Sequence, residues 1–125
     1  MEQTAKRILV VEDDDSVRRL LVRLLSVEGY RVQEAGSAAA GLEIIHSDPP
    51  DLVITDLLMP DTDGLELIMR IRRSGTSLKI IAISAGGRIG PNTYLKLAEK
   101  LGADRTITKP FQPETLLRAV RELLP

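Results

Sequence analysis

The chain has 125 residues, a length typical of one domain that buries enough surface to fold without covalent cross-links. It has no cysteine, which excludes disulfides and thiolate metal sites, and no apolar run long enough to cross a membrane. Its 17 basic and 18 acidic side chains give a formal net charge of -1, and aromatic residues are scarce. Direct nucleic-acid binding is therefore not expected. A cytoplasmic location is expected, because the chain does not open with the apolar core of a signal peptide.

The first half of the chain alternates short apolar stretches with amphipathic ones. Residues 7–11 are apolar and β-branched and predict a strand, and residues 14–28 carry leucines at helical spacing and predict a helix. Residues 31–35 predict a second strand. A second helix is expected between Ser37, which is a good capping residue, and Pro49.

The second half continues the alternation. The expected strands are 52–55, 79–83 and 105–108, and the expected helices are 64–73, one with an apolar stripe at 94–101, and one that begins at Pro113. Five strands that alternate with five helices predict a parallel sheet covered by helices on both faces.

The composition of the strands predicts their order. Strands 7–11, 52–55 and 79–83 are nearly continuous apolar runs, as expected of strands buried on both faces. Strands 31–35 and 105–108 alternate polar and apolar residues, as edge strands do. The resulting order is 2-1-3-4-5, that of a flavodoxin-like doubly wound α/β fold, and the ligand crevice is expected at the carboxyl ends of strands one and three.

Polar side chains follow four neighbouring strands of this sheet. Glu12 and Asp13 follow the first strand, Asp56 the third, Ser84 the fourth and Lys109 the fifth. One such acid is explained equally well as a helix cap, but three acids, a hydroxyl and a lysine at matching strand ends indicate a shared site. Crowded carboxylates without soft ligands favour a hard cation, with Mg²⁺ the most plausible.

The same residues point to phosphoryl chemistry. A carboxylate beside Mg²⁺ can take a phosphoryl group as an acyl phosphate, and such transfer depends mainly on positioning and charge neutralisation. Asp56 ends the central strand and is best placed as the acceptor. Lys109 can neutralise the phosphoryl oxygens, and Ser84 can donate a hydrogen bond to them.

Four ordered motifs, ILVVEDD, ITDLLMPDTDG, ISA and TKPF, resemble those of response-regulator receiver domains of bacterial two-component phosphorelay signalling. The resemblance implies that residues 1–125 form a single receiver domain, not a turnover enzyme, which takes its phosphoryl group from a sensor histidine kinase or a phosphotransfer protein. It implies these roles: phosphoacceptor Asp56; Mg²⁺ ligands Glu12, Asp13, Asp56 and the backbone carbonyl of Leu58; switch hydroxyl Ser84; phosphate-binding Lys109, with a cis peptide bond to Pro110. The domain is expected to be a monomer or weak dimer that signals through its fourth helix, fifth strand and fifth helix.

Two features depart from the family pattern. Thr106 occupies a switch position that often carries an aromatic ring, so the coupling of ring rotation to the switch hydroxyl is in question. The stretch SAGGRIGP, which begins at Ser84, is longer than usual. It has no phosphate-loop signature, and its glycines favour either a long turn or a mobile switch segment.

Two other functions remain open from the sequence. A haloacid-dehalogenase-like hydrolase also uses Asp, Ser and Lys with Mg²⁺, but it normally needs a second acid where this chain has Leu58. A pseudo-receiver would bind a partner without phosphorylation, which the full set of site residues argues against. Two groups of arginines are interpreted as solvated helix faces: Arg18 and Arg19, and Arg70, Arg72 and Arg73.

Overall fold

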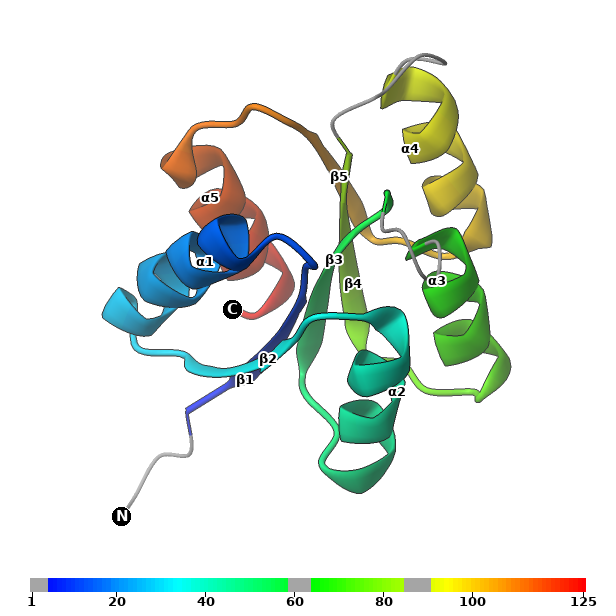
Figure 1. Cartoon of the computed structure of the whole chain (residues 1–125), viewed down its shortest axis with the longest axis horizontal. Coiled ribbons are helices and arrows are strands. Elements are labelled where there is room, and N and C mark those ends of the chain that lie inside the picture. Colours follow the sequence, from blue (N-terminus) through cyan, green and yellow to red (C-terminus); the bar gives the residue numbers. More distant parts are fainter. Residues whose placement is uncertain (1–4, 59–63, 85–90) are drawn as a thin grey trace.

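The computed structural model describes residues 5–58, 64–84 and 91–125, with the backbone alone for 91–94, and its elements follow the expected alternation (Figure 1). The strands are β1 Arg7–Val11, β2 Arg31–Ala35, β3 Leu52–Asp56, β4 Lys79–Ser84 and β5 Arg105–Thr108. The helices are α1 Asp15–Val27, α2 Ala38–Ser47, α3 Gly64–Arg73, α4 Pro91–Leu101 and α5 Pro113–Leu123. Residues 85–90, which hold most of the SAGGRIGP stretch, lie outside the described residues.

All neighbouring strands of the sheet are parallel, and their order is β2-β1-β3-β4-β5, which confirms the predicted topology. Both β3 and β4 run one residue further than predicted. Asp56 pairs with Ile83, and Ser84 pairs with Thr108. Both polar residues therefore belong to the ordered sheet, which fixes their backbones more firmly than a loop would.

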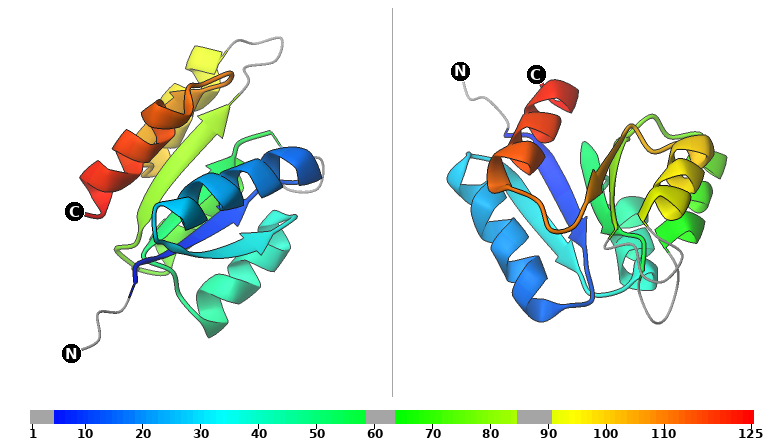
Figure 2. Two further views of the ribbon diagram at one scale, coloured as in Figure 1. Left: turned by 90° about the vertical axis from the view of Figure 1, so that its left-hand side faces the viewer. Right: turned by 90° about the horizontal axis from the view of Figure 1, so that it is seen from above.

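Helices cover both faces of the sheet and bury a separate apolar cluster on each (Figures 1 and 2). Alternate strand residues supply the two clusters, since successive side chains of a strand point to opposite faces. Leu9 and Val53 pack with residues of α2, α3 and α4, whereas Ile8 and Ile54 pack with residues of α1 and α5. None of the helices within the described residues is long and apolar enough to cross a membrane.

Local signals set the helix ends. The Asp14 carboxylate accepts from the backbone N–H groups of Ser16 and Val17, and the Ser37 hydroxyl accepts from that of Ala40. These bonds satisfy backbone donors that the first turn of a helix leaves unpaired. The start of α1 is thereby fixed directly after the acidic residues that follow β1.

Arg72 is only partly exposed and is bound on several sides, so the interpretation of a solvated face is wrong for it. Its guanidinium donates to the carbonyls of Gly102 and Leu78, at 2.9 Å and 2.7 Å, and to a carboxylate oxygen of Asp104 at 3.0 Å. That carboxylate also accepts from the backbone N–H of Ile80. Arg72 lies four residues after the buried Ile68 and so projects beside the core, where it joins the carboxyl end of α4 to the start of β4.

Candidate functional site

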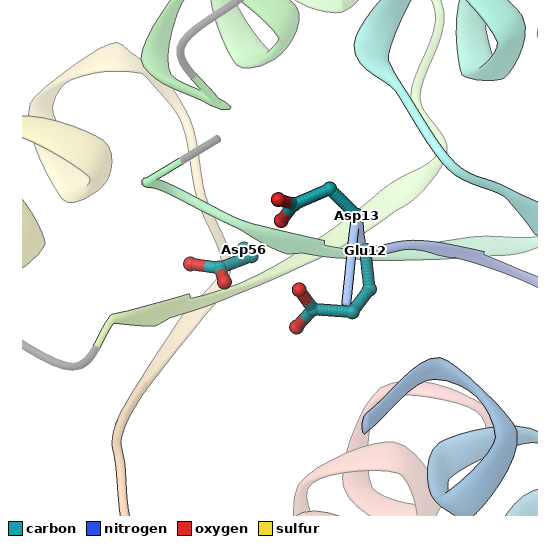
Figure 3. A group of neighbouring side chains, drawn as sticks. All are labelled: Glu12, Asp13 and Asp56. Carbon is teal, nitrogen blue, oxygen red and sulfur yellow. The ribbon is translucent and has the colours of Figure 1, made fainter. Parts of the chain in front are cut away.

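Three carboxylates from two neighbouring strands meet at the carboxyl edge of the sheet. Glu12 and Asp13 follow β1, and Asp56 is the last residue of β3. Each offers an oxygen that lies within 4.8 Å of the others (Figure 3). Glu12 and Asp56 are buried and Asp13 is exposed, so the cluster opens to solvent on the side of Asp13.

Lys109 supplies the cation of this cluster. Its Nζ donates to Glu12 Oε1 and to Asp56 Oδ2, each at 3.0 Å. Its backbone N–H donates to the carbonyl of Ser84 at 2.9 Å, which fixes the lysine beside the end of β4. The peptide bond between Lys109 and Pro110 is cis, as the resemblance implied. The ammonium is thus held against both buried carboxylates.

Burial and crowding raise the affinity of Glu12 for a proton. Burial is the main cause that raises its pKa above the ordinary value of 4.5, and the charge of Asp56 raises it further, while Lys109 and the backbone N–H of Asp14 oppose the change. Burial alone would lower the pKa of Lys109, but its hydrogen bonds to Asp56 and Glu12 outweigh that effect and raise it. Glu12 and Asp56 therefore share the ammonium of Lys109, while Asp13 adds a third carboxylate to the cluster without binding it.

The donor set fits a hard divalent cation. The cluster offers carboxylate oxygens alone, without the nitrogen or sulfur ligands that favour transition metals. A cation among them would relieve the repulsion that raises the pKa of Glu12. The exposed position of Asp13 leaves room for water and for a phosphate oxygen to complete the coordination.

The other expected site residues have defined positions. Ser84 ends β4 and is fully buried, one register position beyond Ile83, the partner of Asp56. The backbone N–H of Leu58 donates to Asp56 Oδ1 at 3.0 Å, so Leu58 contacts Asp56 through its main chain. Thr106 lies on β5 opposite Ala82 and is half-buried. The structure therefore gathers Glu12, Asp13, Asp56 and Lys109. Thr106 lies on β5, with β4 between it and the strand of Asp56.

Gly64 is a site residue that sequence reasoning missed. A Cβ at this position would lie 2.4 Å from the carbonyl oxygen of Asp56 and 2.8 Å from the Cα of Leu57. Its backbone N–H donates to the carbonyl of Leu57 at 3.1 Å. Only glycine permits the amino end of α3 to approach the end of β3 so closely. The sequence predicts Gly64 only as the start of a helix, because the local pattern does not show which backbone lies opposite it.

Arg18 is a second residue that was interpreted wrongly, since its side chain is only 17% exposed. It lies three and seven residues before the buried Leu21 and Leu25, on the helix face that packs against the sheet. That spacing was visible in the sequence. Two adjoining arginines suggest a solvated face, but that interpretation holds for Arg19 and not for Arg18.

Comparisons with known proteins agree with this geometry. The sequence matches the response regulator receiver domain family over residues 8–121. It is 41% identical over 118 residues to the response regulator MprA of Mycolicibacterium vanbaalenii, with 94% of this chain and 50% of that protein aligned. The chain thus spans about half the length of this curated relative.

Solved structures resemble the chain over nearly its whole length. A CheY-like receiver domain protein from Methanospirillum hungatei has a TM-score of 0.87 and 30% identity, covering 95% of this chain and 93% of that one. A receiver domain protein from Clostridium thermocellum has a TM-score of 0.87 and 28% identity, covering 94% of this chain and 93% of that one. The fold is therefore of the CheY-like, flavodoxin-like class. The chain belongs to the response regulator receiver domain family of two-component signalling.

Proposed function

We propose that this receiver domain, spanning residues 1–125, accepts a phosphoryl group on Asp56 from a phosphohistidine. The observation that carries the proposal is the placement of Asp56 between two other carboxylates and a lysine at the edge of the sheet. A carboxylate oxygen of Asp56 would form the new bond to phosphorus as the bond from phosphorus to the histidine nitrogen breaks. The imidazole leaves, and no other covalent chemistry is required of the protein.

The remaining site residues position the transferred phosphoryl group and neutralise its charge. Glu12, Asp13, Asp56 and the backbone carbonyl of Leu58 would hold Mg²⁺, which supplies charge neutralisation for the transferred group when bound. Lys109 already binds Asp56 Oδ2 and is placed to bind the phosphoryl oxygens instead. The Ser84 hydroxyl would donate to the same group. The backbone N–H of Leu58 holds Asp56 Oδ1, which leaves Oδ2, the oxygen that now accepts from Lys109, to form the bond to phosphorus.

We further propose that a histidine kinase or phosphotransfer protein covers the groove beside this site. The groove has a volume of about 550 Å³, and its lining is largely apolar. Its lining comes from α1, from the segment between β5 and α5, and from the start of α5: Val17, Leu20, Leu21, Leu24, Lys109, Pro110, Phe111 and Pro113. A macromolecule that brings phosphohistidine to Asp56 must cover the surface that adjoins Lys109. Leu20 is 53% exposed there and offers it an apolar contact.

Replacing Leu20 with glutamine is expected to slow phosphotransfer from a kinase by about 10-fold or more, because an apolar interface contact of this size is worth more than 1 kcal/mol. Phosphorylation by acetyl phosphate, which needs no docking, should keep its rate. The kinase used is the one that phosphorylates the wild-type chain fastest in a panel of autophosphorylated histidine kinases. Val27→Gln is the matched control, since Val27 is also an exposed apolar residue of α1 but lies outside the groove. Equal slowing by both variants would contradict docking at the groove.

We propose that phosphorylation changes the surface formed by α4, β5 and α5, and that a downstream partner binds this surface. These elements adjoin the site through Lys109, which follows β5, and through Ser84, which precedes α4. Leu97 of α4 is 43% exposed and offers a partner an apolar contact on this face. Thr106 cannot supply the aromatic ring that is common at its position, so the face is expected to respond through Ser84 and Lys109.

Incubation with acetyl phosphate and Mg²⁺, followed by intact mass measurement, tests the proposed function. The wild-type chain is expected to gain one phosphoryl group, which EDTA prevents. Asp56→Asn should gain none, because an amide is a far weaker nucleophile than a carboxylate. Asp13→Asn should be phosphorylated more slowly but still on Asp56, since the variant loses a metal ligand rather than the acceptor.

Three results would count against the proposal. Phosphorylation that persists in Asp56→Asn would mean that another residue is the acceptor. No phosphorylation of the wild-type chain by any phosphodonor would favour the pseudo-receiver. Repeated turnover of unrelated phosphomonoesters would favour the hydrolase, although Leu58 stands where such enzymes carry an acid.

A further inference from the structure

Arg18 connects α1 to the acidic segment after β1 and to the neighbouring strand. Its Nη1 donates to the backbone carbonyl of Glu12 at 2.8 Å. Its Nε donates to a carboxylate oxygen of Glu34 on β2 at 3.1 Å, and its Nη2 donates to Asp15 at 2.6 Å. One planar guanidinium therefore makes three hydrogen bonds in fixed directions, a pattern that lysine cannot reproduce.

These contacts hold the peptide group that joins Glu12 to Asp13. The backbone N–H of Glu12 donates to the carbonyl of Ala35 on β2 at 3.0 Å. The carbonyl of Glu12 accepts from Arg18 and marks the start of the link to Asp13. With both main-chain groups of Glu12 bound, the backbone has little freedom to rotate between the two acids.

The ion pairs of Arg18 alone do not account for this arrangement. The side chains of Asp15 and Glu34 are 69% and 48% exposed, and ion pairs so open to solvent contribute little to stability. They do, however, restrict where the guanidinium can lie. Their structural effect is to aim Nη1 at the carbonyl of Glu12, which is the part-buried contact.

We propose that Arg18 is a positioning residue for the metal site, which sets the direction in which Glu12 and Asp13 present their carboxylates. The inference rests on the proposed Mg²⁺ site. Arg18 touches neither metal nor phosphoryl group, and it acts through the Glu12 carbonyl. In metal sites, partners that orient the ligands commonly change metal affinity by about 10–100-fold when they are removed.

The direction of the change in Mg²⁺ affinity distinguishes a positioning role of Arg18 from an effect of its charge. Arg18 is a cation near a site that binds a cation, so its charge alone opposes Mg²⁺. Removal of that charge would tighten Mg²⁺ binding slightly if electrostatics were its only contribution. Removal of a positioning contact weakens binding instead. The two explanations therefore predict changes of opposite direction.

The test is a titration of ¹⁵N-labelled protein with Mg²⁺, followed by backbone NMR shifts, without any phosphodonor. Arg18→Met is expected to raise the Mg²⁺ dissociation constant by about 10-fold. Arg18→Lys keeps the charge but not the planar fork, and should lose affinity nearly as much. Arg19→Met is the matched control: it removes the same charge from the neighbouring exposed residue and should bind Mg²⁺ at least as tightly as the wild type.

Different outcomes of the titration would contradict the role of Arg18 and the proposed Mg²⁺ site. Wild-type protein that shows no Mg²⁺-dependent shifts near Asp13 and Asp56 would overturn the metal site itself. A wild type that binds, with Arg18→Met and Arg18→Lys binding as tightly, would overturn the role of Arg18 alone. Urea unfolding of each variant confirms that it is folded during the titration. If Arg18→Met does not fold, Arg18→Lys compared with Arg19→Met decides the question.

Discussion

Gly64→Ala is expected to destabilise the domain by about 3 kcal/mol and to abolish most phosphorylation at Asp56. The added Cβ would lie 2.4 Å from the carbonyl oxygen of Asp56, a backbone atom that cannot rotate away. Either α3 moves outward or the end of β3 moves, and the second response displaces the carboxylate of Asp56, the proposed acceptor. Urea unfolding measures the stability, and intact mass after acetyl phosphate treatment measures phosphorylation.

Gly36→Ala is the matched control for this substitution. A Cβ at Gly36 would make one ordinary contact, 3.6 Å from Arg18 Nη1, and the position needs no left-handed backbone. Its stability should change by less than about 0.5 kcal/mol, as for most surface substitutions. A Gly64→Ala variant as stable as Gly36→Ala would show that the approach of α3 to β3 is not tight in solution.

Lys109→Met is expected to destabilise the metal-free domain by about 3 kcal/mol at pH 7.5, because removal of one partner leaves buried carboxylates without a cation. Glu12 and Asp56 have side chains only 3% and 10% exposed, and both bind the lysine. Millimolar Mg²⁺ should restore much of the loss, since a bound cation neutralises the same oxygens. Urea unfolding in EDTA and in Mg²⁺ measures both effects.

The loss in Lys109→Met should depend on pH in a defined direction. The folded-state pKa of Glu12 is raised above its ordinary value of 4.5, chiefly by burial, and removal of Lys109 raises it further. A raised folded-state pKa gives stability that is fully present below the unfolded pKa and is lost as pH rises through the folded one. The destabilisation should therefore be small near pH 4.5 and should grow toward pH 7.5.

Two variants complete this experiment. Lys100→Met removes an exposed lysine of α4 and should leave stability in EDTA unchanged at every pH. Glu12→Gln in the Lys109→Met background removes the titrating acid and should flatten the pH dependence. If Lys109→Met lost the same stability at pH 4.5 and pH 7.5, its effect would come from packing rather than from charge.

The fold and the acidic part of the site could be predicted because their signals are local and repeated. Apolar runs and alternating strands encode the order of the sheet, and parallel strands bring their carboxyl ends to one edge. Glu12, Asp56 and Lys109 could therefore be placed together without knowledge of their contacts. The sequence predicts β3 and β4 one residue too short, because pairing such as that between Asp56 and Ile83 depends on a neighbouring strand, which the local sequence does not show.

Gly64 and the arginines could not be placed because their roles depend on approaches between distant elements. The requirement for glycine at Gly64 comes from the backbone of β3, and the contacts of Arg72 come from residues about 30 positions later. Charge doublets obscured the helical spacing that puts Arg18 on a buried face. An arginine three or four residues from buried apolar residues lies on the same helix face as they do, whatever the charge of its neighbours.

Arg72 also determines how α4 can move. Its guanidinium holds Gly102, the residue that directly follows α4, and joins it to Leu78 and Asp104 at the base of β4 and β5. The carboxyl end of α4 is therefore anchored to the base of β4 and β5, whereas none of these contacts of Arg72 reaches its amino end, which follows β4 in the chain. We expect a displacement at the Ser84 end of β4 to tilt the helix about its anchored end, on the side nearest the proposed phosphorylation site.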